Sequence, residues 1–360
     1  MLILYKKYIR KDFIMLNLIK YFKDLGMKNP LRSIKLINDA IRVTKLDLRE
    51  LVVFTEAASG EFIYTPIIAA MAGAKKVYAI AGNSDYGSKE EIKKNTLLFA
   101  ELCGVNEKIE VVFDKNNIKD ADIITNLGFV RPIDKRTIDN MKENAVVPYM
   151  CEAWEVREGD VDIDYCRKKG IKVMGTNEDF EDLDVFNFTK PLIIKMLLDI
   201  GIEIYKSKII ILSNDKFGKV IEESLLNVGA NAILLNEITE ENLECIKCTD
   251  ALIIADYTSK ECFIGANNSV LNGKNLKKLC PYISIIQFAG LVDIEDLEAN
   301  NIEYYPKKKV GSVRMGRTLA YVGAKPIIDL HSAGLKVGEL MHNYNMESEF
   351  LGEYDIMQKI

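Results

Sequence analysis

The chain has 360 residues, of which 48% are hydrophobic and 28% charged, and its formal net charge is -5 at pH 7. This is the composition of a globular protein long enough for two domains, and it excludes an extended disordered chain. A net negative charge does not indicate the basic surface that nucleic acid needs. No apolar run approaches the roughly 20 residues that span a bilayer. We therefore expect neither a nucleic-acid partner nor an integral membrane span.

Seven cysteines are scattered along the chain with no secretory signal ahead of them. This pattern predicts reduced thiols and a cytoplasmic protein. Cys245 and Cys248 form a single C-x-x-C, but no second pair and no histidine stands at a spacing that would complete a zinc site. We predict no metal.

The first half of the chain reads as a helical segment followed by an α/β unit. Residues 1–49 carry apolar side chains at helical spacing, interrupted by charges. From residue 50, β-branched runs alternate with amphipathic stretches such as 65–72 and 89–103. The predicted strands are 51–55, 76–81, 109–113, 121–125, 145–150 and 171–174. Alternation of this kind is typical of a parallel sheet with helices on both faces.

A second series of strands follows a long apolar-periodic helix in 185–205. Its predicted strands are 208–212, 231–236, 251–255, 282–287 and 302–305. A further strand at 325–330 and a last helix from Leu335 complete the prediction. The fold class is therefore α/β, with two doubly wound parallel-sheet domains, Rossmann-like or flavodoxin-like, and an interlobe cleft. The predicted parts are 1–49, 50–184, 185–205, 206–324 and 325–360, and the last returns to the first domain.

Polar loops follow the strands of the first domain, where open α/β sheets bind ligands. These loops are 55–62, 82–88, 126–132 and 151–160. The candidate substrate-binding residues on the first two loops are Thr55, Glu56, Ser59, Gly60 and Asn83. Gly60 allows backbone N–H groups to approach a ligand closely. The alternative is that Thr55 and Ser59 only cap the following helix.

Arg131, Glu155 and Arg157 are the candidate catalytic residues on the other two loops. An arginine such as Arg131 can hold a carboxylate in a bidentate fork, or form a surface ion pair instead. Glu155 stands beside Trp154, and a carboxyl group against an aromatic wall can have a raised pKa and act as an acid or base. Equally, Glu155 and Arg157 can simply neutralise one another.

In the second domain the loop after 208–212 stands where a dinucleotide-binding protein has G-x-G-x-x-G. Ser213 and Asp215 take the first two glycine places, and Gly218 keeps the third. Asp215 adds bulk and like charge where a pyrophosphate would lie. Glu237 follows the next strand, about 20 residues on, where an acidic group holds an NAD ribose. These four residues mark a candidate NAD or NADP site whose phosphate-binding loop lacks two of its three glycines.

The residues "DVDIDYCRKKGIKVMGTNE" (160–178) resemble a segment of the D-isomer-specific 2-hydroxyacid dehydrogenases, the formate and glycerate dehydrogenase group. The resemblance implies a substrate role for the first domain and a nucleotide role for the second. Residues 290–297 are similar to a segment that follows the family's substrate-binding arginine, but Phe288 and Ala289 stand where that arginine is expected. Arg131, Arg157 or Arg314 would then have to replace it.

The segment 329–334 looks like the histidine turn of the same family, which makes His331 the candidate general acid–base. Because His331 follows a predicted strand, we expect its side chain to be exposed at the edge of a sheet. We therefore predict an NAD(P)-linked oxidoreductase that acts on a small anionic metabolite. Two alternatives are a non-redox ligand-binding protein or pseudoenzyme with a degenerate dinucleotide loop, and a transferase or lyase that uses another nucleotide. The sequence does not determine the oligomeric state, and a homodimer is one of the possibilities.

Overall fold

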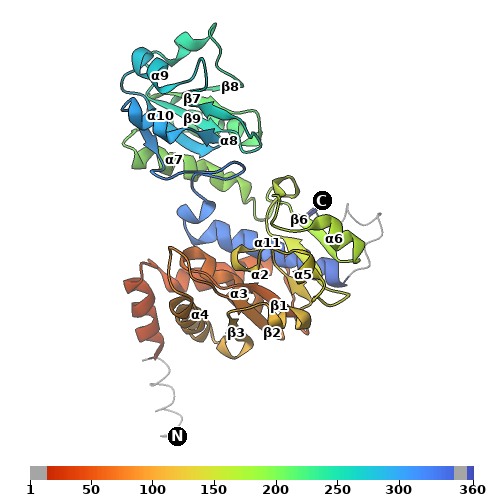
Figure 1. Ribbon diagram of the computed structural model, residues 1–360. Helices are drawn as coiled ribbons and strands as arrows, with labels where there is room; N and C mark the ends of the chain where they lie inside the picture. The colour runs from red at the N-terminus through yellow and green to blue at the C-terminus, as the bar shows by residue number, and fades with distance from the viewer. Residues whose placement is uncertain (1–13, 344–354) are drawn as a thin grey trace. The chain divides into compact units, whose positions relative to one another are not determined.

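The computed structural model describes residues 14–343 and 355–360 (Figure 1). The chain divides into two compact units, Met1–Val185 with Gly323–Ile360, and Phe186–Val322. Each unit is built on a mostly parallel sheet flanked by helices, so the predicted fold class, with two doubly wound α/β domains, is confirmed.

The sheet of the first unit has seven strands in the order β14-β6-β5-β4-β1-β2-β3. Strands β1 to β6 are parallel, and β14 pairs with β6 in the antiparallel direction. The strands are β1 (Val52–Glu56), β2 (Lys76–Ile80), β3 (Ile109–Val112), β4 (Ile123–Ile124), β5 (Val146–Tyr149), β6 (Lys172–Thr176) and β14 (Met357–Lys359). The six parallel strands coincide with the six predicted ones, because runs of β-branched residues buried on both faces mark such strands. The sequence analysis missed β14.

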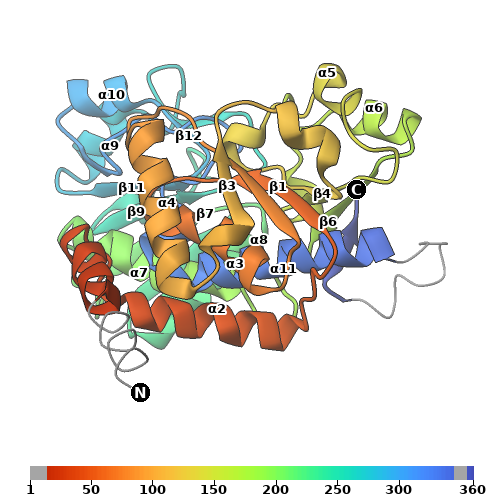
Figure 2. The same cartoon turned by 90° about the horizontal axis from the view of Figure 1, so that it is seen from below.

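The helices of the first unit cover both faces of this sheet. They are α2 (Pro30–Thr44), α3 (Tyr64–Met71), α4 (Lys89–Cys103), α5 (Lys135–Ile138), α6 (Ile163–Lys168) and α11 (Ala324–Asn343), with a further helix over residues 14–24. Helix α4 shows how local sequence sets its ends. Ser88 and Glu91 form a capping box at its start, and Gly104 ends it in the left-handed conformation, at φ 72°. Figure 2 shows α2 and α11 packed along the same side as α3.

The predicted strand at 325–330 is wrong, because these residues form the first turns of α11. Most of this helix is buried, and periodicity alone cannot distinguish a buried helix from a buried strand. Its glycines allow it to lie close to the sheet. A Cβ at Gly334 would collide with Met150 Sδ, and one at Gly338 would come within 2.8 Å of Ile123.

The second unit has a five-stranded parallel sheet in the order β13-β11-β9-β7-β8. Its strands are β7 (Lys208–Leu212), β8 (Asn231–Leu235), β9 (Ala251–Ala255), β11 (Ser284–Ala289) and β13 (Glu303–Tyr305), with a separate pair β10 (Cys262–Ile264) and β12 (Leu291–Val292). The helices are α7 (Thr189–Asp199), α8 (Lys216–Asn227), α9 (Gly273–Leu279) and α10 (Ile294–Ala299). The predicted linking helix contains α7.

The two strand orders differ in a way that bears on function. The first unit has the order 3-2-1-4-5-6 that is typical of dinucleotide-binding domains, with its switch point between β1 and β4. The second unit has the flavodoxin-like order 2-1-3-4-5, with its switch point between β7 and β9. The strand order associated with dinucleotides thus belongs to the unit for which the sequence resemblance implied a substrate role.

Candidate functional site

The carboxyl ends of β1, β2, β4 and β5 lie at one edge of the first sheet, because these strands are parallel. Glu56, the last residue of β1, is only 8% exposed at this edge. Its Oε1 accepts a hydrogen bond of 3.0 Å from the backbone N–H of Phe129, in the loop after β4. Burial raises the pKa of the Glu56 carboxyl, opposed by the backbone N–H groups of Phe129 and Gly128 and by the charge of Arg131. Glu56 therefore links the two strands at the switch point.

The turn after β1 leads into the 3-10 helix η1 (Gly60–Ile63) and then α3. Gly60 has φ +61°, and no described atom beyond its two chain neighbours lies within 4 Å of where its Cβ would be, so the turn has open space at this point. The Ser59 side chain makes no capping hydrogen bond. Thr55 is fully buried within β1 and bonds Thr125 Oγ1 at 2.8 Å, which removes it from contact with a ligand. Of the residues predicted here, Ser59 and Gly60 face outward.

The loop after β2 packs against the loop after β4. Asn83 is exposed, and its Oδ1 accepts a hydrogen bond of 2.9 Å from the backbone N–H of Lys89 at the start of α4. Gly82 lies against the Phe129 ring, where an added Cβ would come within 2.5 Å of a ring carbon. The ring of Phe129 thus fills the space between the two loops.

The candidate catalytic residues Arg131, Glu155 and Arg157 are brought together by a residue that the sequence analysis did not single out. The Asp160 carboxylate lies 2.6 Å from Arg131 Nη1 and 3.8 Å from Arg157 Nη1, and Arg157 Nη2 lies 3.2 Å from Glu155 Oε2. All four side chains are largely buried. Burial raises the pKa of the nearby Cys151 thiol, and so does the charge of Glu155, while the charges of Arg157 and Arg131 oppose the rise. Asp160 is one of four acidic residues in the loop 151–160, and no sequence signal distinguishes it from the others.

His331 lies in α11 and is 2% exposed, contrary to the exposed edge that the predicted strand favoured. Its Nδ1 lies 2.6 Å from the Thr65 hydroxyl of α3, and burial lowers its pKa to about 4. The imidazole is therefore neutral at physiological pH, and helix–helix packing encloses it.

Side-chain hydrogen bonds of Ser213 and Asp215 hold the loop after β7 in the second unit. Asp215 is the N-cap of α8, and its carboxylate accepts hydrogen bonds from the backbone N–H groups of Phe217 at 2.9 Å and Tyr257 at 2.6 Å. Ser213 is buried and donates to the carbonyl of Ala255 at 2.5 Å. Burial raises the pKa of Asp215 despite these bonds. A side-chain carboxylate thus occupies the helix N-terminus where a phosphate binds in dinucleotide folds.

Of the remaining candidates of the second unit, Glu237 and Arg314 are exposed and Gly218 is not. Gly218 is buried and keeps α8 close to the sheet, since an added Cβ would lie 2.7 Å from Ser213 Cβ. Glu237 follows β8 and lines a depression of about 560 Å³ together with Asn214 and Asp256. Arg314 is exposed in the segment after β13. Glu237 and Arg314 belong to the second unit and the other catalytic and substrate candidates to the first.

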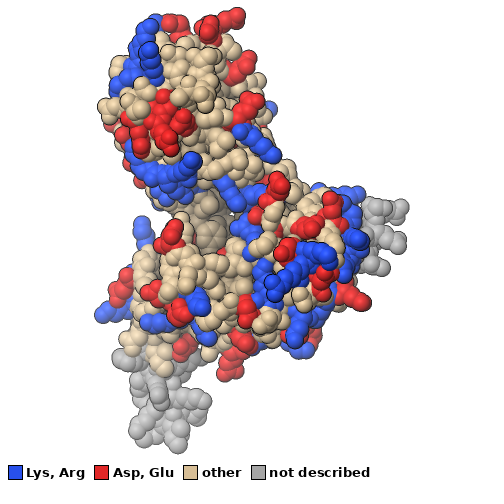
Figure 3. Space-filling model, in the orientation of Figure 1, with Lys and Arg blue, Asp and Glu red and all other residues tan. Residues whose placement is uncertain are grey.

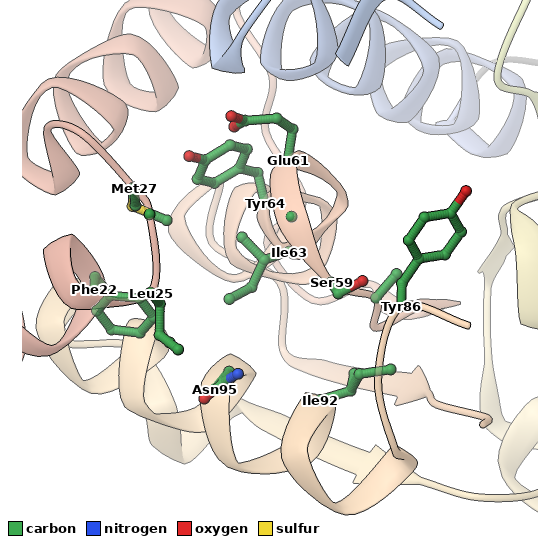
Figure 4. Close-up of a pocket in the computed structure, with 13 residues that line it drawn as sticks. Phe22, Leu25, Met27, Ser59, Glu61, Ile63, Tyr64, Tyr86, Ile92 and Asn95 are labelled. Carbon is green, nitrogen blue, oxygen red and sulfur yellow. The ribbon is translucent and has the colours of Figure 1, made fainter. Parts of the chain in front are cut away.

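A pocket of about 440 Å³ opens beside the turn after β1. Figure 4 shows Glu61 and Tyr64 on one side of it and α4 on the other, with the helix of residues 14–24 and the segment after it at one end. Sequence reasoning missed this pocket, because its walls come from four separate segments of the first unit. Its labelled lining residues are Phe22, Leu25, Met27, Ser59, Glu61, Ile63, Tyr64, Tyr86, Ile92 and Asn95.

Surface charge does not mark a polyanion site on the face in Figure 3, where acidic and basic side chains are intermingled on each unit. Within residues 14–343 and 355–360, no helix has the length and apolar character needed to cross a membrane. The same described residues contain no group of three or more His, Cys, Asp or Glu side chains placed to hold a metal ion.

Comparison with known proteins establishes the fold. No family model matches the sequence, and no curated protein sequence is significantly similar to it. A dipicolinate synthase chain from Bacillus halodurans has a similar structure, with 11% identity over 82% of this chain and 99% of that chain and a TM-score of 0.51. At this identity the likeness shows a shared fold.

Solved structures of the group named by the sequence resemblance are also among the matches. A phosphoglycerate oxidoreductase from Vibrio cholerae shares 11% identity over 82% of this chain and 99% of its own, with a TM-score of 0.47. An NAD-dependent formate dehydrogenase from Staphylococcus aureus, solved in complex with NAD, shares 11% over 79% and 99%, with a TM-score of 0.43.

Proposed function

We propose that the protein is an NAD(P)-linked oxidoreductase and that its first unit holds the cofactor, at the carboxyl edge of β1 and β2. The observation that carries this proposal is the strand order of the first sheet, with a small-residue turn between β1 and α3 at its switch point. The open space at Gly60 and the uncapped Ser59 fit a pyrophosphate at this turn. The Asp215 carboxylate makes the loop of the second unit a poor fit.

The substrate in this proposal is a small anion held by the cluster at the same edge. Arg131 and Arg157 supply the guanidinium groups, and an incoming carboxylate would exchange with Asp160 or Glu155 for their hydrogen bonds. When bound, NAD(P) supplies or accepts a hydride. His331 is not assigned to the reaction, because it is buried behind α3. The seven free thiols support a cytoplasmic location as part of the proposal.

Titration with NADH and NADPH, followed by nicotinamide fluorescence, tests the proposal. Ser59→Asp places a carboxylate at the turn, and repulsion of about 1 to 4 kcal/mol predicts at least about 5-fold weaker cofactor binding. Asn106→Asp is the matched control, since it adds the same charge at an exposed site before β3, at the opposite edge. Equal affinity of Ser59→Asp and wild type, or no saturable signal at millimolar cofactor, would contradict the proposal.

A second candidate is a non-redox ligand-binding protein. The packing of Phe129 against Gly82 favours it, because the ring fills space between the loops after β2 and β4, which a dinucleotide crossing the switch point would have to clear. A saturable signal with NADH separates the two candidates, since the second predicts none.

A further inference from the structure

The pocket beside the turn after β1 has the size and walls of a small-molecule site. Its volume of about 440 Å³ lies within the range of roughly 300 to 1,000 Å³ that is usual for such sites. Phe22 and Leu25 provide apolar walls at one end, and Tyr86, which is 78% exposed, stands at the other (Figure 4). A flat aromatic ring is the kind of ligand that such walls favour.

The lining of the pocket favours an uncharged ligand group over an anionic one. Among the described residues that line it, none is Lys, Arg or His, and the only ionisable carboxyl group is that of Glu61. The phosphate part of a nucleotide would therefore stay at the turn of Ser59 and Gly60, which borders the pocket, and an uncharged part would enter further.

Two polar groups on facing sides of the pocket can recognise the edges of such a ring. Asn95 Oδ1 accepts a hydrogen bond of 2.7 Å from the Tyr21 hydroxyl, which orients the side-chain amide so that its nitrogen can donate to a ligand. The Glu61 carboxyl is held by a hydrogen bond from the Tyr64 hydroxyl, which is itself fixed by Ser33 at 2.9 Å. Its other oxygen can accept from a ligand N–H.

We propose that this pocket receives an aminopurine ring, with the exocyclic amine donating to Glu61 and a ring nitrogen accepting from Asn95. The assignment rests on the proposed function, in which the ring is the adenine of NAD(P). Glu61 and Asn95 are then specificity-determining residues for the base. A 6-oxopurine places a carbonyl where the amine would be, and this carbonyl faces the Glu61 carboxylate without a hydrogen bond.

Calorimetric titration of the full chain with adenosine and with inosine tests the assignment, because the two nucleosides differ at this position. The wild type is expected to bind adenosine at least about 10-fold more tightly, from the hydrogen bond to a charged acceptor. Glu61→Gln is expected to abolish the preference, since an amide can donate to the inosine carbonyl as readily as it accepts from the amine. Glu90→Gln, an exposed position on α4 outside the pocket, is expected to keep it.

The ratio of the two affinities is the deciding quantity, because a merely structural role for Glu61 would change both affinities together. Equal binding of adenosine and inosine by the wild type, or an unchanged preference in Glu61→Gln, would overturn the assignment. NADH titration distinguishes this failure from that of the proposed function. NADH binding without base preference rejects the pocket assignment alone, and adenosine preference without NADH binding rejects the cofactor assignment alone.

Discussion

The free energy of unfolding should decrease as the pH falls below about 6.5, and His331→Gln should remove a large part of this pH dependence. The folded-state pKa of His331 is about 4 because of burial, against an ordinary value of 6.5. As the pH falls through 6.5, the unfolded chain binds a proton that the folded chain does not, so stability is lost until about pH 4. The shift corresponds to roughly 3 kcal/mol.

Urea unfolding followed by the fluorescence of Trp154 measures this effect, because the only tryptophan lies in the same unit as His331. At pH 7 we expect His331→Gln to be less stable than the wild type by about 1 to 3 kcal/mol, since the Thr65 hydrogen bond is lost. The difference should shrink or reverse by pH 4. His342→Gln, which changes the other histidine of α11, is the matched control. Parallel pH profiles for His331→Gln and wild type would contradict a buried neutral imidazole and return His331 to the catalytic candidates.

The position of His331 also shows where the sequence is ambiguous. Residues 325–330 are as apolar as a strand, and Pro326 is compatible with either a strand edge or the first turn of a helix. The six strands of the first sheet were predictable because Gly-rich and polar loops bound each β-branched run. Strand order was not predictable, since it depends on long-range pairing such as that of Val53 with both Val77 and Ile123.

The candidate site was predictable to a similar extent. Loops that follow parallel strands meet at one edge, so Arg131, Glu155 and Arg157 could be placed together from their positions after β4 and β5. The role of Asp160 could not, because the sequence does not reveal which carboxylate an arginine meets in space. The pocket at Glu61 and Asn95 needed the packing of residues 14–24 against α4, which is a tertiary contact.

The two units share an arrangement at their switch points, where the neighbouring strands of the sheet, β1 with β4 and β7 with β9, are not consecutive in sequence. At the amino edge, Asp122 accepts from the N–H of Val52 at 2.8 Å in the first unit, and Asp250 accepts from Lys208 at 2.7 Å in the second. At the carboxyl edge, Glu56 and Asp215 accept from the loop after the neighbouring strand. Glu56 and Asp215 differ in what else they do. Asp215 caps the helix after β7, whereas Glu56 leaves the turn before α3 uncapped.

Replacing Asp215 separates its structural role from any role in cofactor binding. Asp215→Gly removes the acceptor for the N–H groups of Phe217 and Tyr257, and the loss of a helix cap and of charge-assisted hydrogen bonds should cost about 3 kcal/mol. Thermal unfolding by circular dichroism, with hydrogen exchange of α8, measures this loss. Asp215→Asn keeps one acceptor oxygen and should lose less.

Asp215→Gly should bind NADH with an affinity within about threefold of wild type, because the proposed cofactor site lies in the other unit. Asp250→Gly is the matched control, since it removes a carboxylate that accepts a backbone N–H at the opposite edge of the same sheet. A gain of about 10-fold or more in Asp215→Gly alone, worth roughly 1.4 kcal/mol, would place the dinucleotide at the N-terminus of α8. It would also show that the native carboxylate excludes the cofactor by taking the position of its phosphate.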